Sequence, residues 1–268
     1  MKANGKTIVV TGAGSGMGRE LTLHLLAKGA RVAAVDMNET SLAETLALAK
    51  DKQNMASRHI LNITDKVGVE ALPASVIAAH GAVDGIINNA GIIQPFVRFY
   101  DLPFDAIERV MNVNFYGTLY MIKAFLPHLR QRPEAHIVNI SSMGGFLPVP
   151  GQTIYGASKA AVKLLTEGLH SELSDTSVRV TVVFPGAIAT NISQNSGVTI
   201  SSGAEAQENS FPTLSAAKAA EIIIDAMEQN RFRVLVGKDA KLMDMLYRLN
   251  PRRAAGFIYK QMQALLPK

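Results

Sequence analysis

Short runs of apolar, largely β-branched residues alternate with segments of helical periodicity, and this alternation constrains the fold more than any other feature of the chain. Nearly continuous apolar strands suit a parallel sheet that is covered on both faces. The alternation implies right-handed βαβ units, and therefore a doubly wound α/β sheet of about seven strands with helices on both faces. The expected strands cover residues 7–10, 30–35, 57–61, 85–88, 136–140, 178–183 and 233–236. The expected helices cover residues 17–28, 40–50, 65–80, 105–130, 152–174 and 215–230.

Two regions of the chain differ in charge. Residues 1–237 are expected to form one domain, and residues 238–268 a basic, amphipathic helical extension. The extension holds seven Lys or Arg residues and two acidic ones, so it carries the whole net charge of +5. The domain itself is neutral, and its sequence has no helix-turn-helix, aromatic RNA platform or zinc finger pattern. Nucleic acid is therefore not expected as a partner.

Composition excludes several kinds of site. The chain has no cysteine, which rules out disulfides, thiolate nucleophiles and Cys-ligated zinc. Its six histidines do not pair at metal-ligand spacing, so no metal is expected and the histidines are assigned to the surface or to helix caps. No secretory segment precedes the first strand, and no apolar run reaches the ~20 residues that span a bilayer. A cytoplasmic location is expected.

A glycine-rich loop follows the first expected strand. Residues 11–18 read Thr-Gly-Ala-Gly-Ser-Gly-Met-Gly, which places Gly12, Gly16 and Gly18 between a strand and a helix. Bare backbone at such a turn can approach a pyrophosphate, and the helix N-terminus directs its N–H groups at the anion. The order differs from G-x-G-x-x-G and from a P-loop, which needs Lys-Ser/Thr after its last glycine. A purely structural turn is the alternative, but this position favours dinucleotide binding in a Rossmann-type fold.

Asp36 ends the second expected strand, eighteen residues after Gly18. A carboxylate there can accept hydrogen bonds from an adenosine ribose, and it would repel a 2′-phosphate. Neither Ser15 nor Met37 supplies a compensating positive charge. NAD is therefore predicted over NADP, with helix capping as the alternative role of Asp36.

Tyr155 and Lys159 lie one helical turn apart, so they share one face of an expected helix. An adjacent ammonium favours the phenolate, which would let the tyrosine exchange a proton nearer to neutral pH. Ser142 ends the preceding strand, thirteen residues before Tyr155. Taken alone, Tyr-x-x-x-Lys also arises by chance on solvated helices. A serine hydrolase is disfavoured, because Ser142 is not part of a Gly-x-Ser-x-Gly elbow.

In combination these segments resemble the ordered signature of the short-chain dehydrogenase/reductase family. They occur in the family's order and spacing, and the resemblance covers residues 5–236 but not 237–268. The segments that carry it are 11–18, Asn88-Asn-Ala-Gly91, Asn114, Ser142, Tyr155-x-x-x-Lys159 and Pro185-Gly186 with Thr190.

The resemblance implies a role for each matching residue. Tyr155 would transfer the hydroxyl proton, and Lys159 would lower its pKa and bind the nicotinamide ribose. Ser142 would hydrogen-bond the substrate oxygen. Asn114 would hold a water that connects Lys159 to solvent, with a buried structural amide as the alternative. The residues expected to contact NAD are Gly12, Ser15, Gly16, Met17, Gly18, Asp36, Asn62, Asn89, Ala90, Gly91, Tyr155, Lys159, Pro185, Gly186, Ile188 and Thr190.

One of these positions departs from the family pattern. Asn62 stands where an aspartate often binds the adenine amino group, and an Asn carbonyl can accept the same hydrogen bond. The resemblance further implies a homodimer or homotetramer built on the helices at 105–130 and 152–174.

Three segments are expected to line the substrate pocket: 92–96, 145–150 and the irregular stretch after Asn191, which has the length of a lid or binding loop. The first two are largely apolar, and no Lys or Arg follows Ile92 until Arg98. They predict a hydrophobic secondary alcohol or the matching ketone as substrate.

The basic extension has two interpretations. The favoured one is a helix that packs on its own subunit or a neighbour and closes the cleft, and the other is an amphipathic helix on an anionic membrane. For the whole chain we predict an NAD-dependent alcohol dehydrogenase or ketone reductase. The rival is an NAD-binding regulator that lost turnover, and the intact set Asn114, Ser142, Tyr155 and Lys159 favours the enzyme.

Overall fold

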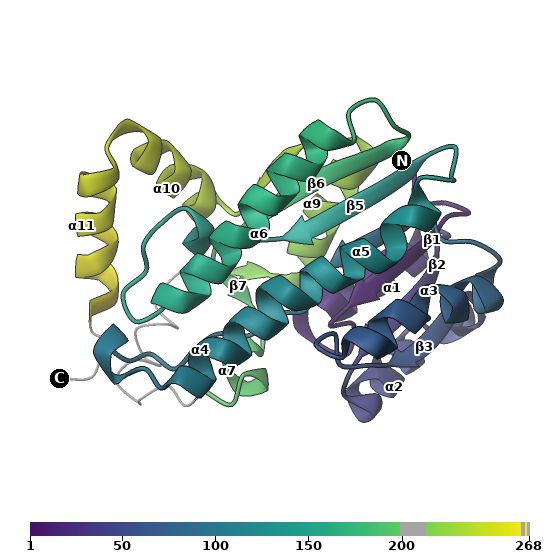
Figure 1. The fold of residues 1–268 in the computed structure, drawn as a ribbon, viewed down its shortest axis with the longest axis horizontal. Coiled ribbons are helices and arrows are strands. Elements are labelled where there is room, and N and C mark those ends of the chain that lie inside the picture. The colour runs from purple at the N-terminus through teal and green to yellow at the C-terminus, as the bar shows by residue number, and fades with distance from the viewer. Residues whose placement is uncertain (199–212, 264–265, 267–268) are drawn as a thin grey trace.

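The computed structural model describes residues 1–198, 213–263 and 266, and its centre is a seven-stranded parallel sheet of order β3-β2-β1-β4-β5-β6-β9 (Figure 1). The predicted doubly wound α/β fold is confirmed. Strands β1, β4 and β5 are buried along their whole length, which explains their continuous apolar sequence. The strands are β1 Thr7–Thr11, β2 Arg31–Asp36, β3 Ala56–Ile60, β4 Gly85–Asn88, β5 Ala135–Ile140, β6 Val178–Pro185 and β9 Arg233–Val236.

Helices cover both faces of the sheet. Alternate residues of β1 point to opposite faces, so Ile8 and Val10 join one core cluster and Val9 joins the other. The first cluster is closed by α1 (Gly16–Ala27), α2 (Glu39–Leu48) and α9 (Ala216–Glu228). The second is closed by α3 (Lys66–His80), α5 (Thr118–Leu129) and α6 (Thr153–Glu172).

The helix predicted at 105–130 is interrupted. The structure has α4 over Phe104–Met111, a π-helical turn η3 over Asn112–Gly117, and then α5. Pro127 lies inside α5, two residues before its last residue. A proline this close to a helix end removes only one backbone hydrogen bond.

Short elements connect the larger ones. They are η1 (Lys50–Met55), η2 (Phe99–Asp101), η4 (Met143–Gly145) and α7 (Ile192–Asn195), together with a two-stranded sheet of β7 (Ile188–Ala189) and β8 (Leu214–Ser215). The sequence did not predict β7 or β8. The loop predicted after Asn191 begins with α7, and its residues 199–212 lie outside the described part of the chain.

The predicted C-terminal extension forms two helices, α10 (Lys238–Leu249) and α11 (Pro251–Met262). They are separated at Asn250, whose backbone is extended and whose side chain caps α11 ahead of Pro251. Met243, Ala254 and Ile258 bury their side chains against Leu147 in a third cluster. Among the helices that the structure describes, none is long and apolar enough to cross a bilayer. The cytoplasmic location remains a prediction.

Candidate active site

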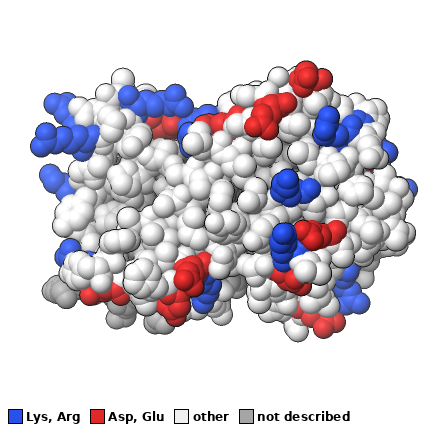
Figure 2. Space-filling model, viewed as in Figure 1, with Lys and Arg blue, Asp and Glu red and all other residues white. Residues whose placement is uncertain are grey.

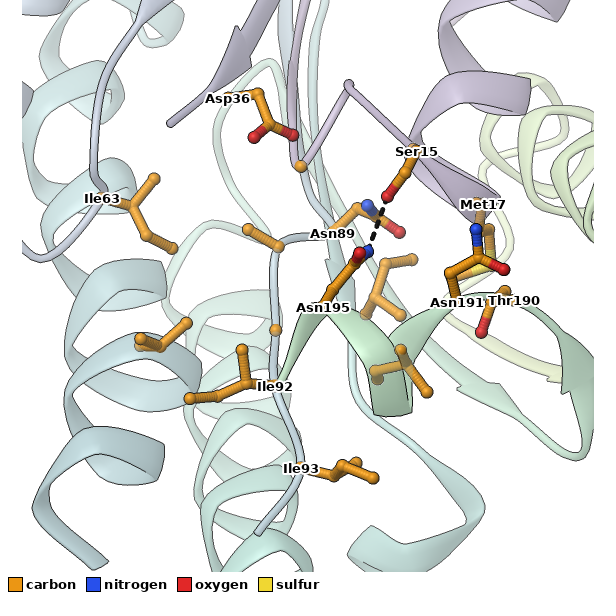
Figure 3. Close-up of a pocket in the computed structure, with 18 of the residues that line it drawn as sticks. Ser15, Met17, Asp36, Ile63, Asn89, Ile92, Ile93, Thr190, Asn191 and Asn195 are labelled. Carbon is orange, nitrogen blue, oxygen red and sulfur yellow. Dashed lines mark hydrogen bonds between the residues drawn. The ribbon is translucent and has the colours of Figure 1, made fainter. Parts of the chain in front are cut away.

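A cleft of about 820 Å³ opens at the carboxyl ends of the strands. It lies beside the junction of β1 and β4, where the strand order reverses, which is where ligands bind in open α/β sheets. All sixteen residues predicted to contact NAD line this cleft. Figure 3 shows Asp36 and Ser15 toward one end and Ile92 and Ile93 toward the other. The arrangement fits an elongated ligand with chemically different ends.

The glycine-rich loop brings bare backbone to the floor of the cleft. Gly12 has φ +68°, and a Cβ atom at Gly18 would lie 1.9 Å from the Gly12 carbonyl oxygen. Only glycine lets α1 begin this close to the turn. The Ser15 hydroxyl does not cap α1 but accepts a hydrogen bond from Asn195 Nδ2 at 2.8 Å (Figure 3). The first turn of α1 therefore offers a place for a pyrophosphate, with Asn195 of α7 above it.

Asp36 is held by backbone N–H groups on both sides of its carboxylate. Oδ2 accepts from Gly14 at 2.8 Å, and Oδ1 accepts from Asn38 at 2.9 Å. Its neighbour Met37 is 68% exposed. Each carboxylate oxygen has further lone pairs, so Asp36 can also accept hydrogen bonds from a ribose. Asn38, not Asp36, caps α2, so the alternative role of Asp36 as the cap is wrong.

Two asparagines in the lining of the cleft have structural partners. Asn89 donates from Nδ2 to the Thr11 carbonyl at 3.0 Å, which ties β4 to the glycine-rich loop. Asn62 Oδ1 accepts from the backbone and hydroxyl of Thr64 at 3.0 and 2.9 Å. Asn62 lines the cleft as predicted, but its carbonyl is already engaged, so the Nδ2 amide is its freer group.

Tyr155 and Ser142 meet in the cleft. Tyr155 comes from the first turn of α6, and Ser142 lies two residues after the end of β5, at the N-cap of η4. The Ser142 hydroxyl hydrogen-bonds the phenol. Ser142 Oγ accepts the Gly144 N–H at 3.0 Å, which leaves its own proton free to donate. Burial raises the pKa of Tyr155, and the Ser142 hydrogen bond opposes this rise.

Lys159 lies beneath the tyrosine and is only 4% exposed. Its Nζ donates to the Ile140 carbonyl at 3.0 Å and lies 5.9 Å from the centre of the Tyr155 ring. Burial lowers its pKa to about 8. The structure corrects one expectation here: the pKa of Tyr155 is raised, because burial outweighs the hydrogen bond and Lys159 is directed at a carbonyl instead of at the phenol.

Asn114 lies behind the cleft and not in its lining. The side chain is fully buried, whereas Asn112 is exposed, so Asn114 is the inward-facing residue of the pair as predicted. Oδ1 accepts from Ile92 N at 2.9 Å, and Nδ2 donates to Ile92 O and to Ser158 Oγ at 3.0 and 2.9 Å. The structure thus gives Asn114 a bracing contact, and its role in holding a water stays a prediction.

Residues at the end of β6 and after it also line the cleft. Pro185, Gly186, Ile188 and Thr190 line it as predicted. Ala187 N donates to Asp239 Oδ2 at 2.7 Å, which fixes this turn to the start of α10.

Gln94 was expected only as part of a pocket wall, yet it is fully buried beneath the site. Its Oε1 accepts from the N–H groups of Ile154 and Tyr155 at 2.8 and 3.0 Å, and its Nε2 donates to Gly151 O at 3.0 Å. Gln152 returns the contact by donating to the Gln94 carbonyl at 2.8 Å. Gln94 therefore caps the helix that carries Tyr155, although it comes from another loop. Its sequence position gives no signal of this, because the partners lie about sixty residues away.

The segment 145–150 was predicted to line the substrate pocket, but none of its residues lines the cleft. Leu147 is fully buried, and Phe146 contacts Phe184 edge-on and lies near Tyr247 of α10. These side chains are apolar because they pack against the C-terminal helices. The predicted walls at 92–96 and after Asn191 do contribute. The residues that line the cleft from these segments are Ile92, Ile93, Asn191, Ile192, Gln194 and Asn195.

The histidine assignment needs one correction. His136 is not at the surface or at a cap but is fully buried in β5, where Nε2 lies 2.8 Å from Thr181 Oγ1. Within the described ranges, no group of three His, Asp or Glu residues could hold a metal ion.

Comparison with known proteins decides the family. The family model for short chain dehydrogenases matches residues 6–201. The chain belongs to the short-chain dehydrogenase/reductase family. Among the relatives of this short-chain dehydrogenase/reductase is SadH of Mycobacterium tuberculosis, which is named as an oxidoreductase and is 37% identical over 253 residues, covering 91% of each chain.

Solved structures agree with this assignment. A short-chain dehydrogenase/reductase from Burkholderia phymatum in complex with NAD superposes with a TM-score of 0.86 at 25% identity, covering 94% of this chain and 96% of that chain. A short-chain dehydrogenase from Burkholderia cenocepacia in complex with NADP gives a TM-score of 0.81 at 26% identity, covering 96% and 99%. Structural neighbours in the family thus include both NAD and NADP binders.

Proposed function

We propose that this short-chain dehydrogenase/reductase interconverts a hydrophobic secondary alcohol and its ketone with NAD, and that Tyr155 is the acid and base. The observation that carries the proposal is the meeting of the Tyr155 and Ser142 hydroxyls in the cleft, directly above the buried Lys159. Two hydroxyls at one point can hold a single carbonyl oxygen and supply it with a proton.

The residues support distinct parts of this chemistry. Ser142 donates its free proton to the substrate oxygen and so stabilises negative charge there. Tyr155, whose pKa is raised by burial, gives a proton to that oxygen in reduction and takes it back in oxidation. Lys159 uses one N–H for Ile140 O and has two left for ribose hydroxyls. When bound, a nicotinamide dinucleotide would supply or accept the hydride.

Asp36 and Met37 support NAD as the cofactor. A 2′-phosphate on the adenosine ribose would face the Asp36 carboxylate, and Met37 beside it carries no charge. Of the described residues that line the cleft, Lys159 is the only Lys or Arg, and it lies at the opposite end. Nothing among them would offset the repulsion.

The reactive end of the cleft supports an apolar substrate. Apolar side chains line this region, and apart from the reacting hydroxyls and Lys159 its polar side chains include the amides of Asn191 and Gln194. The apolar residues are Ile92, Ile93, Ile188 and Ile192. Among the described residues that line the cleft, none carries a guanidinium with which a carboxylate or phosphate on the substrate could pair. A lipid-like, steroid-like or aliphatic ketone fits these walls.

Kinetics with paired cofactors and a substrate panel test the proposal. We expect kcat/KM at least tenfold higher with NAD than with NADP, and higher for apolar secondary alcohols than for sugars or phosphorylated alcohols. Preference for NADP would contradict the role of Asp36, and preference for charged substrates would contradict the apolar pocket. NADH binding by fluorescence without turnover of any alcohol would instead indicate a regulator.

The first variant to make is Tyr155→Phe, which removes only the phenol oxygen. We expect kcat to fall by about 10³-fold, because a positioned acid or base contributes roughly 10²–10⁴-fold. NADH affinity should stay within a few-fold, since the ring remains. A variant that kept most of its rate would show that another group moves the proton.

We also infer that the chain forms a homodimer or homotetramer through α4, η3 and α6. Phe104, Tyr116 and Leu164 on these elements are 82%, 41% and 69% exposed. Large apolar side chains grouped on neighbouring helices are typical of subunit interfaces. Sedimentation velocity of the purified chain would test this, and a monomer at micromolar concentration would contradict it.

A further inference from the structure

The outward surface of α10 and α11, here called the tail face, carries charge of one sign. The two acidic residues of these helices are turned inward: Asp239 accepts from Ala187 N, and Asp244 pairs with Arg233 at 2.7 Å. Arg248 also reaches Asp244 yet remains 64% exposed. Figure 2 shows basic side chains gathered at the upper left, where α10 and α11 lie in Figure 1. The exposed basic residues of the tail face are Lys238, Lys241, Arg248, Arg252, Arg253 and Lys260.

The same surface exposes large apolar side chains. On α10 they recur at spacings of three and four residues, which places them on one side of the helix. Their exposed fractions lie between 46% and 77%. On α11, Phe257 and Tyr259 lie on the two sides of the buried Ile258. Scattered exposed apolar residues are ordinary, but the three on one side of α10 form a continuous apolar stripe. The apolar residues of the tail face are Leu242, Met245, Leu249, Phe257 and Tyr259.

The tail face is presented by a fixed support. The inner sides of the two helices bury Met243, Ala254 and Ile258 against Leu147. The bidentate pair of Arg233 with Asp244 adds a second attachment, with Nη atoms 2.7 and 3.0 Å from the carboxylate oxygens. The inner sides of α10 and α11 thus make the contacts with this subunit, and the exposed apolar side chains lie on the other sides of the two helices.

We propose that the tail face docks on an anionic lipid surface. Charge complementarity selects this occupant, because clustered Lys and Arg are attracted to anionic headgroups while Leu, Met and Phe enter the acyl boundary. A second copy of the chain is a poorer occupant, because a two-fold contact would bring like charges together. The contact is peripheral and reversible.

Docking would also place the reactive end of the cleft beside the lipid. Met143 and Phe146, which follow Ser142, pack against the inner side of the tail helices, as does Leu147. An apolar substrate dissolved in the membrane would then enter without crossing water. This consequence rests on the proposed function, whereas the docking itself does not.

Vesicle sedimentation of the full chain tests the docking. We expect the protein to pellet with phosphatidylcholine vesicles that contain phosphatidylserine, and to remain in the supernatant with phosphatidylcholine alone. High salt should release it, because surface charges are screened. Equal pelleting with both vesicle types, or with neither, overturns the proposal whatever the enzyme assay shows.

Two matched double variants identify the surface. Arg252→Glu/Arg253→Glu should weaken vesicle binding by at least about tenfold, because each basic residue near the membrane contributes measurably. Arg58→Glu/Arg130→Glu changes the net charge equally on exposed residues elsewhere and should bind as the wild type does. Equal loss in both pairs would show only a net-charge effect and would overturn the assignment.

A third double variant tests the apolar side chains of the tail face. Leu249→Ser/Phe257→Ser should also weaken vesicle binding, and unchanged binding would contradict the apolar contribution. Circular dichroism and NAD turnover in solution confirm that each variant is folded.

Discussion

At the scale of single residues, Lys159 is a cationic side chain in a position where burial disfavours its charged form. Its ammonium is 4% exposed, its hydrogen-bond partner is the neutral Ile140 carbonyl, and burial lowers its pKa from 10.5 to about 8. A drop of this size corresponds to about 3 kcal/mol. The free enzyme thus keeps a group that destabilises the fold, which is expected of residues retained for binding and chemistry.

Lys159→Met is predicted to raise stability while abolishing turnover. Between pH 8 and 10.5 the unfolded chain binds a proton that the folded chain does not, so the Lys159 contribution to stability rises as pH increases and is smallest below pH 8. At pH 7 the variant should be more stable by about 1–2 kcal/mol, because loss of the Ile140 hydrogen bond offsets part of the gain. Urea unfolding at pH 7 and at pH 10 measures both the gain and its loss. A variant less stable than the wild type at pH 7 would contradict the burial effect.

Residue identities at the cleft were predictable where the signal is local. The glycines at 12, 16 and 18, Asp36 at a strand end and the Tyr155/Lys159 pair each sit next to the element that positions them. The pKa of Tyr155 was not predictable, because it depends on how deeply the folded protein buries the phenol. His136 was misplaced for the same reason, since a polar residue in an apolar strand gives no sign of its burial.

At the scale of elements, the start of α6 depends on a side chain from elsewhere. Gln152 occupies the N-cap position but makes no capping hydrogen bond with its side chain. Gln94 instead accepts from the second and third N–H groups of the helix, at Ile154 and Tyr155. These are the groups that an N-cap side chain normally satisfies. The height of Tyr155 in the cleft is therefore set by the loop after β4.

Gln94→Ala is predicted to lower both stability and turnover. Two buried N–H groups would lose their acceptor, which costs about 1–3 kcal/mol for each group left unsatisfied. The first turn of α6 would loosen, and kcat should fall about tenfold while NADH affinity stays within about three-fold.

Two further variants separate positioning by Gln94 from a general loss of packing. Gln94→Glu keeps an acceptor for Ile154 and Tyr155 and should recover part of kcat. Gln131→Ala, at an exposed site, should leave both kcat and stability unchanged. Equal kcat in Gln94→Ala and the wild type would show that the cap does not position Tyr155.

Helices and strands were predicted well where the hydrophobic pattern of the segment itself determines its structure. The strands agree with the expected ranges to within about two residues. The π-helical turn at Asn112–Gly117 was missed, because its sequence reads as ordinary helix and the turn serves tertiary contacts: Asn114 reaches Ile92, and Gly117 lies against Ile63. The break at Asn250 was also missed, although Pro251 is a local signal that could have revealed it.

At the scale of the whole molecule, the N-terminus is held by the segments that precede β5 and β9. The Met1 ammonium donates to Asn230 Oδ1 at 2.8 Å and lies 3.2 Å from the Glu134 carboxylate. His136 is buried in β5, the strand that follows Glu134. Its pKa is lowered to about 3, mainly by burial and secondly by the charge of the Met1 ammonium. Thr181 Oγ1 donates to Arg231 O, so the His136 ring must donate from Nε2 and leave Nδ1 without a partner.

This arrangement predicts a specific acid sensitivity. Between pH 6.5 and 3 the unfolded chain protonates His136 and the folded chain does not, so stability falls as pH decreases through this window. At pH 4.5 the loss from this residue is about 2–3 kcal/mol. His136→Leu should lose correspondingly less stability than the wild type between pH 7 and 4.5, as measured by urea unfolding at each pH. Thr181→Val keeps the ring but removes its partner, so it should be less stable throughout and retain the acid sensitivity. Parallel pH profiles for His136→Leu and the wild type would contradict the buried neutral imidazole.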